Sequence, residues 1–208
     1  LHSFPTRRSS DLHIAGAAFA AAMTHTADAA AADATIVAVW KVHQIEFAYE
    51  SPNIAYECES LQKRVAQILQ AVGAYSKMVV ETMHCKRREQ VRRTDIRLTV
   101  AMPVEATEEN VRTAAEFNAR EEIVARIREK PLPAADVRRF PAAWRRVTLS
   151  NSAPAKLAAG DCDLVRVLRD QVFPRIDVRV IGSGMNCGAS PDTRIQPKMR
   201  VHALMPRT

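Results

Sequence analysis

Apolar residues follow two different periods along the chain, and the periods alternate. After Cys58 and again after Cys162 they recur at the spacing of one helix face, through Leu61, Val65, Ile68, Leu69 and Val72 and through Val165, Leu168 and Val172. Alternating or β-branched runs, typical of strands, lie around these sets at Ile45–Phe47, Met78–Val80, Ile96–Pro103, Val178–Ile181 and Met199–Pro206. The pattern predicts an α+β fold in which the order strand, helix, strand, strand occurs twice.

Fixed landmarks recur in the same order in the two parts of the chain. Trp40, Cys58, Cys85 and Met102-Pro103 have counterparts 102 to 104 residues later, at Trp144, Cys162, Cys187 and Met205-Pro206. Such repetition is typical of a duplicated supersecondary unit. We therefore predict a β-α-β-β unit at 35–105, a linker helix with a Pro/Arg-rich connection at 106–143, and a second unit at 144–208. Two ferredoxin-like sandwiches and one shared antiparallel or mixed sheet both fit this prediction. The alternative is two α+β segments that are alike by coincidence.

The four cysteines permit three disulfide pairings, and the predicted lengths of the elements favour one of them. A strand, a helix and a second strand joined by short links normally place the two strands parallel. About 15 helical residues span roughly 22 Å and about 7 strand residues roughly 23 Å, so each helix start comes level with the end of the following strand. We expect Cys58 to pair with Cys85 and Cys162 with Cys187, which would also indicate an oxidising compartment.

The first 34 residues are set apart from the predicted fold. Residues 1–12 resemble a sequencing adapter translated in one frame, and a natural basic segment is the alternative. Ile14–Met23 is a short apolar run followed by small-x-small sites at Ala27-Asp28-Ala29 and Ala32-Asp33-Ala34, as in a signal peptide; a disordered Ala-rich leader or a short helix is the alternative. We expect a periplasmic or secreted protein without a transmembrane segment, because no later apolar run reaches the length of a span.

Local signals place the ends of the remaining elements. Thr107, followed by two glutamates, is expected to cap the linker helix, which Pro131 ends. Asp161 is expected to cap the helix of the second unit. Pro141, with arginine pairs before it and at Arg145-Arg146 after it, predicts an exposed connection into that unit.

The chain has a formal net charge of +7 and an apolar fraction of 47 per cent, which indicates a basic globular protein. Its densest basic segment spans residues 86–93, and the cations Lys86, Arg87, Arg88, Arg92 and Arg93 form a candidate site for phosphate, an anionic glycolipid head group or an acidic partner. A solvated loop whose charges protect a sheet edge is the alternative. Aromatic residues make up 5 per cent and do not interleave with this segment, so we expect no nucleic acid partner.

Motifs of catalysis are missing from the sequence, which has no nucleophile elbow, zinc-protease motif, phosphate loop or dinucleotide fingerprint. The best interpretation is a non-enzymatic binding or structural module without a cofactor. One alternative is an enzyme whose site forms between the two repeats. A weaker alternative is a metal site from His43, Cys58, His84 and Cys85, which lacks the close ligand pairs of a zinc site.

Five short motifs stand out along the chain: Trp40, Phe47-x-Tyr49, Tyr56-Glu57-Cys58, the helix end from Ile68-Leu69 to Gly73-Ala74, and Gly160-Asp161-Cys162. Together they resemble a group of uncharacterised bacterial secreted proteins with two cysteine-pair repeats. The resemblance covers most of residues 36–206 and implies secretion and the cysteine framework. It implies no activity, because the group has none assigned. We expect Trp40 and Trp144 to pack in the core or at a sheet edge rather than to stack on a ligand.

Overall fold

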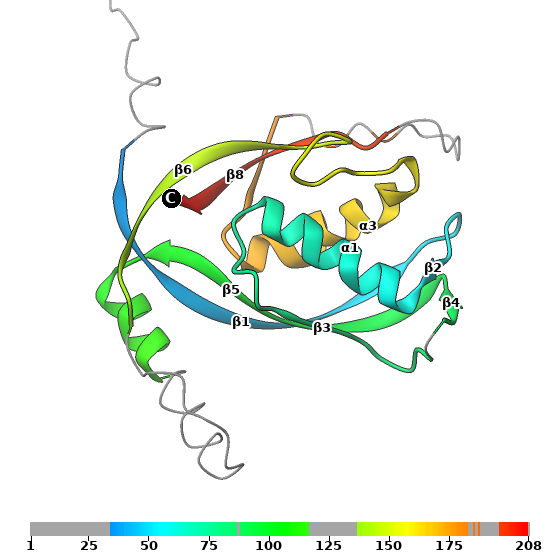
Figure 1. The fold of residues 1–208 in the computed structure, drawn as a ribbon, viewed down its shortest axis with the longest axis horizontal. Coiled ribbons are helices and arrows are strands. Elements are labelled where there is room, and N and C mark those ends of the chain that lie inside the picture. The colour runs from blue at the N-terminus through cyan, green and yellow to red at the C-terminus, as the bar shows by residue number, and fades with distance from the viewer. Residues whose placement is uncertain are drawn as a thin grey trace, which may run out of the picture.

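The computed structural model of the protein describes residues 34–86, 88–116, 137–182, 185, 187 and 196–207. The leader expected over residues 1–34 lies outside the described residues except for Ala34. Arg87 and the second part of the expected linker helix lie outside them as well. The described chain forms a strongly bent sheet that wraps around two helices (Figure 1).

Six strands form one sheet in the order β3-β5-β1-β6-β8-β7, and all of its ladders are antiparallel. The strands are β1 (Ile36–Glu50), β3 (Val79–Thr82), β5 (Arg93–Glu105), β6 (Phe140–Leu149), β7 (Arg179–Ile181) and β8 (Met199–Pro206). We call the part of the chain from β1 to β5 the first half and the part from β6 to β8 the second half. A two-stranded sheet of β2 (Tyr56–Glu57) and β4 (Gln90–Val91) belongs to the first half. The α+β prediction is confirmed, with one shared sheet rather than two sandwiches.

Each half places its helix in the trough of the sheet. α1 (Cys58–Ala71) is regular, whereas its counterpart begins as α3 (Cys162–Val167) and continues as a π-type turn (Leu168–Val172) and a 3-10 turn (Phe173–Arg175). Pro174 explains the change, because it has no N–H to donate and its ring would collide with the carbonyl four residues earlier. In chain order the halves contain β1, α1, β3 and β5, then β6, α3, β7 and β8.

The two halves meet at the centre of the sheet through a short ladder. β1 pairs with β5 from Ala38 to Glu50 but with β6 only from Ile36 to Ala38, after which β1 and β6 diverge. The helices fill the space between the diverging strands (Figure 1). Their apolar faces and the facing strand residues form one core that contains side chains from both halves, among them Tyr49, Leu61, Ile68, Leu98, Leu149, Leu164, Leu168 and Phe173. Because these side chains belong to one cluster, the halves share one hydrophobic core. Burial of each large apolar side chain stabilises the fold by about 1.5–3 kcal/mol.

Both disulfides lie where the element lengths predicted them. Cys58, the first residue of α1, is bonded to Cys85 beyond the end of β3, with their Cα atoms 6.1 Å apart. Cys162, the first residue of α3, is bonded to Cys187 after β7, with their Cα atoms 5.9 Å apart. Each therefore joins a helix start to the loop that follows the next sheet strand of the same half.

The predicted caps have different outcomes. The hydroxyl of Thr107 accepts a hydrogen bond from the backbone N–H of Asn110 (3.2 Å), and residues 108–116 are helical, so this cap is confirmed. Asp161 occupies the N-cap position of α3, as predicted, but its carboxylate makes no hydrogen bond to that helix and instead accepts one from the N–H of Ala158. The connection expected around Pro141 was also wrong, because β6 begins at Phe140 and contains both Pro141 and Arg145-Arg146.

The end of α1 packs closely against the second half. Gly73 has φ = +100°, and a Cβ placed on it would lie 2.8 Å from the carbonyl oxygen of Leu204 in β8. Both the backbone conformation and this close approach require glycine here. No helix in the described part of the chain is long and apolar enough to cross a membrane.

Candidate functional site

The candidate anion-binding residues lie on the segment 86–93, which connects β3 to β5 and ends at Arg93, the first residue of β5; we call this segment the basic loop. The structure describes Lys86, Arg88, Arg92 and Arg93 and shows all four exposed, whereas Arg87 lies outside the described residues. The short strand β4 lies within the loop and pairs with β2. The connection between two strands was predicted from the sequence, whereas the β2–β4 pairing was not. The pairing gives the loop a defined course beside the start of α1.

Backbone hydrogen bonds and the first disulfide anchor the basic loop. The N–H of Cys58 donates to the carbonyl of Glu89 (3.1 Å), and the N–H of Ser51 donates to the carbonyl of Arg92 (2.8 Å). The N–H of Lys86 donates to the carboxylate of Glu89 (2.8 Å), which closes a tight turn. Cys85, covalently bonded to Cys58, fixes the point where the loop begins. The loop is therefore held at both ends and in its middle.

The four described cations of the basic loop have no carboxylate partner among the described residues. Glu89 is the acidic residue of the loop, and its described hydrogen bond goes to backbone. Arg88 also has φ = +65°, a conformation that is unfavourable for a residue with a Cβ. Uncompensated positive charge on an anchored, partly strained segment is suited to holding an anion.

A second group of polar residues joins the two halves at the start of the helices. The carboxylate of Asp161, from the second half, accepts hydrogen bonds from the hydroxyl of Tyr56 and from the N–H of Ala158 (2.6 Å). It also forms an ion pair with Arg64 of α1, with the Nη2 and Oδ2 atoms 2.6 Å apart. Because Asp161 is 1 per cent exposed, both of its oxygens are satisfied by protein rather than by water.

Other side chains extend this inter-half network. The hydroxyl of Ser51 donates to the carboxylate of Asp163 (2.6 Å), and Arg166 pairs with the same carboxylate (2.9 Å).

Burial, together with the hydrogen bond to Asp161, raises the pKa of Tyr56. Burial also raises the pKa of Tyr49, to about 12, so both phenols are neutral at physiological pH.

A hollow of about 360 Å³ lies against this network, and Ser60, Lys63, Arg64 and Gln67 of α1 contribute to its wall. It has residues from both halves around it, as the alternative of an enzyme between the repeats requires. Its buried carboxylate, however, is already occupied by Tyr56, Arg64 and the Ala158 N–H. A carboxylate with this set of partners holds structure together and has no free oxygen for general base catalysis.

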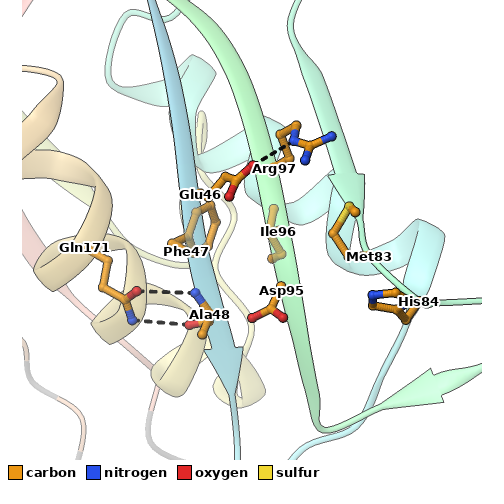
Figure 2. A pocket seen from close by; sticks show the side chains of 9 residues that line it. All are labelled: Glu46, Phe47, Ala48, Met83, His84, Asp95, Ile96, Arg97 and Gln171. Atoms are coloured by element: carbon orange, nitrogen blue, oxygen red, sulfur yellow. Dashed lines mark hydrogen bonds and ion pairs between the residues drawn. The ribbon is translucent and has the colours of Figure 1, made fainter.

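A second, more enclosed hollow of about 420 Å³ lies across β1 and β5, near the end of β3 (Figure 2). Glu46 and Arg97 form an ion pair over it (2.9 Å), and Asp95 and His84 lie along the same groove (Figure 2). His84 has φ = +56° and is exposed. The four side chains do not converge on one point, so this groove has no assembled catalytic set.

The amide of Gln171 closes one side of this groove and covers an open strand edge. It accepts a hydrogen bond from the N–H of Ala48 (3.3 Å) and donates one to its carbonyl (3.2 Å), as a neighbouring strand would do (Figure 2). Arg175 donates to the carbonyl of Glu46 (3.3 Å). These bonds satisfy backbone groups of β1 where β6 has diverged from it. No local pattern in the sequence predicts a role for Gln171 or Arg175 here.

His43 lies in β1 near the same edge. Its Nε2 atom is buried and has no hydrogen-bond partner among the described residues. Burial lowers the pKa of His43, the nearby charge of Lys41 lowers it further, and the charge of Asp177 opposes this. The histidine is therefore held in its neutral form.

Trp40 lies in β1 and Trp144 in β6, the two central strands of the sheet, and both rings pack partly buried against protein side chains rather than at a sheet edge. Trp40 stacks on Phe140, with the ring centroids 4.8 Å apart, and contacts Tyr75 edge-on at 5.1 Å. The indole N–H of Trp144 donates to Glu105 (3.2 Å). The guanidinium of Arg179 lies 5.2 Å from the centroid of the Trp144 ring, a cation–π contact.

The Cys/His metal site proposed as the weaker alternative loses its thiolate ligands, because Cys58 and Cys85 are bonded to each other. Among the described residues, no group of three or more His, Cys, Asp and Glu side chains is placed to hold a metal ion. Comparisons with models of protein families, with curated proteins and with solved structures found no match for the chain.

Proposed function

We propose that the protein is a non-enzymatic binding module of the cell envelope, and that its basic loop binds an anionic envelope component. The observation that carries the proposal is the charge arrangement of the loop. Four exposed cations, at Lys86, Arg88, Arg92 and Arg93, have no carboxylate partner among the described residues. The segment that carries them is anchored by a disulfide and by backbone hydrogen bonds. Anchoring favours binding because less conformational freedom is lost when the partner arrives.

Duplication of one β-α-β-β unit accounts for the architecture. The strand order is symmetric about the β1–β6 pair, and each half has its second strand at the outer edge and its third strand in the middle. Each half also has one disulfide from its helix start. A common ancestral unit explains these correspondences together with the recurring sequence landmarks.

The disulfides support a location outside the cytoplasm, which the same proposal requires. All four cysteines are in disulfides, which persist in oxidising compartments such as the periplasm. The bonded cysteines are separated by 27 and 25 positions in the sequence, and both disulfides lie within single halves. The resemblance to bacterial secreted proteins implies the same location.

Binding to vesicles tests the role of the loop. The oxidised protein would be sedimented with vesicles containing phosphatidylglycerol, and with phosphatidylcholine vesicles as the neutral reference. Each cation near an anionic bilayer contributes about 1 kcal/mol, so R88Q/R92Q/R93Q should weaken binding by roughly a hundredfold. The variant K77Q/R112Q/K156Q removes three exposed positive charges elsewhere and is the matched control. Equal binding by the loop variant and the wild type would refute the proposal.

A further inference from the structure

The solvent face of the second half carries a second cationic surface, which we call the arginine face (Arg146, Arg179, Arg200 and His202). Its residues come from three neighbouring strands, β6, β7 and β8. Arg146 and Arg179 are the antiparallel partners of His202 on its two sides, so the three side chains form a row across the sheet. Arg200 lies two residues from His202 along β8 and therefore points to the same face.

Contacts and burial identify this face as the outer one. Val147 packs against the core and Val201 is fully buried within it, so the alternate residues Arg146, Arg200 and His202 point away from the helices. Arg146, Arg179 and Arg200 are exposed, and His202 is partly buried against the ring of Trp144, with the centroids 5.2 Å apart. In Figure 1 the outer side of β6 and β8 faces away from α1 and α3.

The charges of the arginine face are not compensated. Strands β6, β7 and β8 contain no aspartate or glutamate, and the three arginines have no carboxylate partner among the described residues. The carboxylate of Glu105 lies next to Trp144 and accepts the hydrogen bond of its indole N–H. Arg200 is the diagonal cross-strand neighbour of both Arg146 and Arg179, within reach of long side chains of like charge, so a bound anion would relieve the repulsion among the three guanidinium groups.

We propose that the arginine face binds an acidic polysaccharide whose sugars carry carboxylate groups. The row spans two strand spacings, about 10 Å, and Arg200 lies about 7 Å along β8 from it, so the surface matches an extended chain with repeated charges. The cations are arginines, whose planar guanidinium groups bind carboxylates through two parallel hydrogen bonds. The ladders β6–β8 and β7–β8 are unbroken, which holds the side chains in a fixed array.

The same geometry disfavours a nucleic acid. Single-stranded nucleic acids bind proteins largely by stacking bases on exposed aromatic rings. The Trp144 ring, the aromatic residue nearest to these cations on the same face, already contacts Arg179 and His202, and its N–H is bonded to Glu105. This surface is separate from the basic loop, and its assignment does not depend on what the loop binds.

Titration with polygalacturonate tests the assignment. We expect the wild-type protein to bind this polyuronate in 50 mM NaCl, and R146Q/R200Q to bind it at least tenfold more weakly, with a smaller dependence of the dissociation constant on salt. Arg179 is kept so that its contact with Trp144 survives. K77Q/R112Q, which removes the same charge from exposed positions elsewhere, should stay within twofold of wild type. The melting temperature of R146Q/R200Q should equal or exceed that of the wild type, because repulsion is relieved.

The outcomes separate this proposal from that for the basic loop. R88Q/R92Q/R93Q should keep polygalacturonate binding even if it loses vesicle binding, and R146Q/R200Q should keep vesicle binding. The assignment would be overturned by a wild-type protein that does not bind polygalacturonate, or by equal losses in R146Q/R200Q and K77Q/R112Q. Tighter binding of single-stranded DNA that depends on Arg146 and Arg200 would overturn it as well.

Discussion

Removing the carboxylate of Asp161 should destabilise the protein more than any change to a surface ion pair. Asp161 is 1 per cent exposed and belongs to the second half, whereas two of its partners, Tyr56 and Arg64, belong to the first. Asp161→Ala would leave the guanidinium of Arg64 next to an apolar side chain. The Arg64 side chain is only 18 per cent exposed, so water would replace the lost carboxylate poorly. It would also leave the Ala158 N–H without its acceptor, and the Tyr56 hydroxyl with only the more distant carbonyl of Gly160 (3.5 Å).

The expected magnitude follows from these three losses. Breaking a buried ion pair by removing one partner destabilises a protein by about 3–5 kcal/mol, because the remaining charge is uncompensated. The partial exposure of Arg64 lets water reach the guanidinium, which lowers that contribution. The Tyr56 hydroxyl keeps the carbonyl of Gly160 as a second acceptor, so the orphaned Ala158 N–H adds only about 1 kcal/mol. We expect a loss of about 3–4 kcal/mol in the free energy of unfolding, a large part of the usual 5–15 kcal/mol. Asp161→Asn keeps an oxygen acceptor and should lose about half as much.

Urea unfolding of the oxidised protein at pH 7, followed by circular dichroism, gives the measurement. Asp170→Ala is the matched control, because Asp170 also pairs with an arginine (2.6 Å) but is half exposed, so its loss should stay below about 1 kcal/mol. The double variant R64Q/D161N should be more stable than the sum of the single losses predicts, since neither charge is then left alone. Equal losses for Asp161→Ala and Asp170→Ala would refute the reasoning.

Three further changes test other parts of the fold by the same unfolding assay. C58S/C85S opens a loop of 27 residues and should lose roughly 3.5 kcal/mol, whereas a loss below 1 kcal/mol would show that the disulfide constrains little. Gly73→Ala should lose about 1–3 kcal/mol because of its positive φ and the close carbonyl oxygen, while Gly160→Ala, whose Cβ would meet its nearest atom at 3.4 Å, should stay within about 0.5 kcal/mol. His43 has a pKa below that of the unfolded chain, so the unfolded state takes up its proton first as pH falls. Wild-type stability should therefore decrease below about pH 6.5, by at most about 1.4 kcal/mol per pH unit from this group, and His43→Gln should show a flatter profile between pH 7.5 and 5.

Local patterns were sufficient to predict the regular elements and the disulfides. β8 has the same bounds as the alternating run Met199–Pro206, because alternation directly reports which side chains face a core. The pairing of Cys58 with Cys85 followed from the lengths of one helix and one strand, which depend on backbone geometry rather than on sequence detail. A capping hydroxyl at Thr107 was equally local.

Contacts between distant residues were not predictable in this way. Asp161 has the sequence context of a helix cap, yet Arg64, 97 residues earlier in the chain, binds its carboxylate instead. Gln171 bonds to Ala48 across 123 positions, and its sequence neighbours give no indication that an amide is needed there. Both contacts exist because β1 and β6 diverge, which no local pattern specifies. The arginine face did have a local signal, since Arg146 and Arg200 alternate with core residues, but only the strand order brings them side by side.

The disulfides act within single halves, whereas non-covalent contacts hold the two halves together. The basic loop and the arginine face therefore depend on different bonds. Each disulfide closes a loop within one half, so the basic loop depends on Cys58–Cys85 and is untouched by Cys162–Cys187. The halves are joined instead by three residue pairs of the central ladder, the shared core and the Asp161 network. Weakening that network should destabilise both halves together, because neither has a core of its own. Each binding surface should therefore survive substitution of the other, while a change at the junction between the halves should affect both.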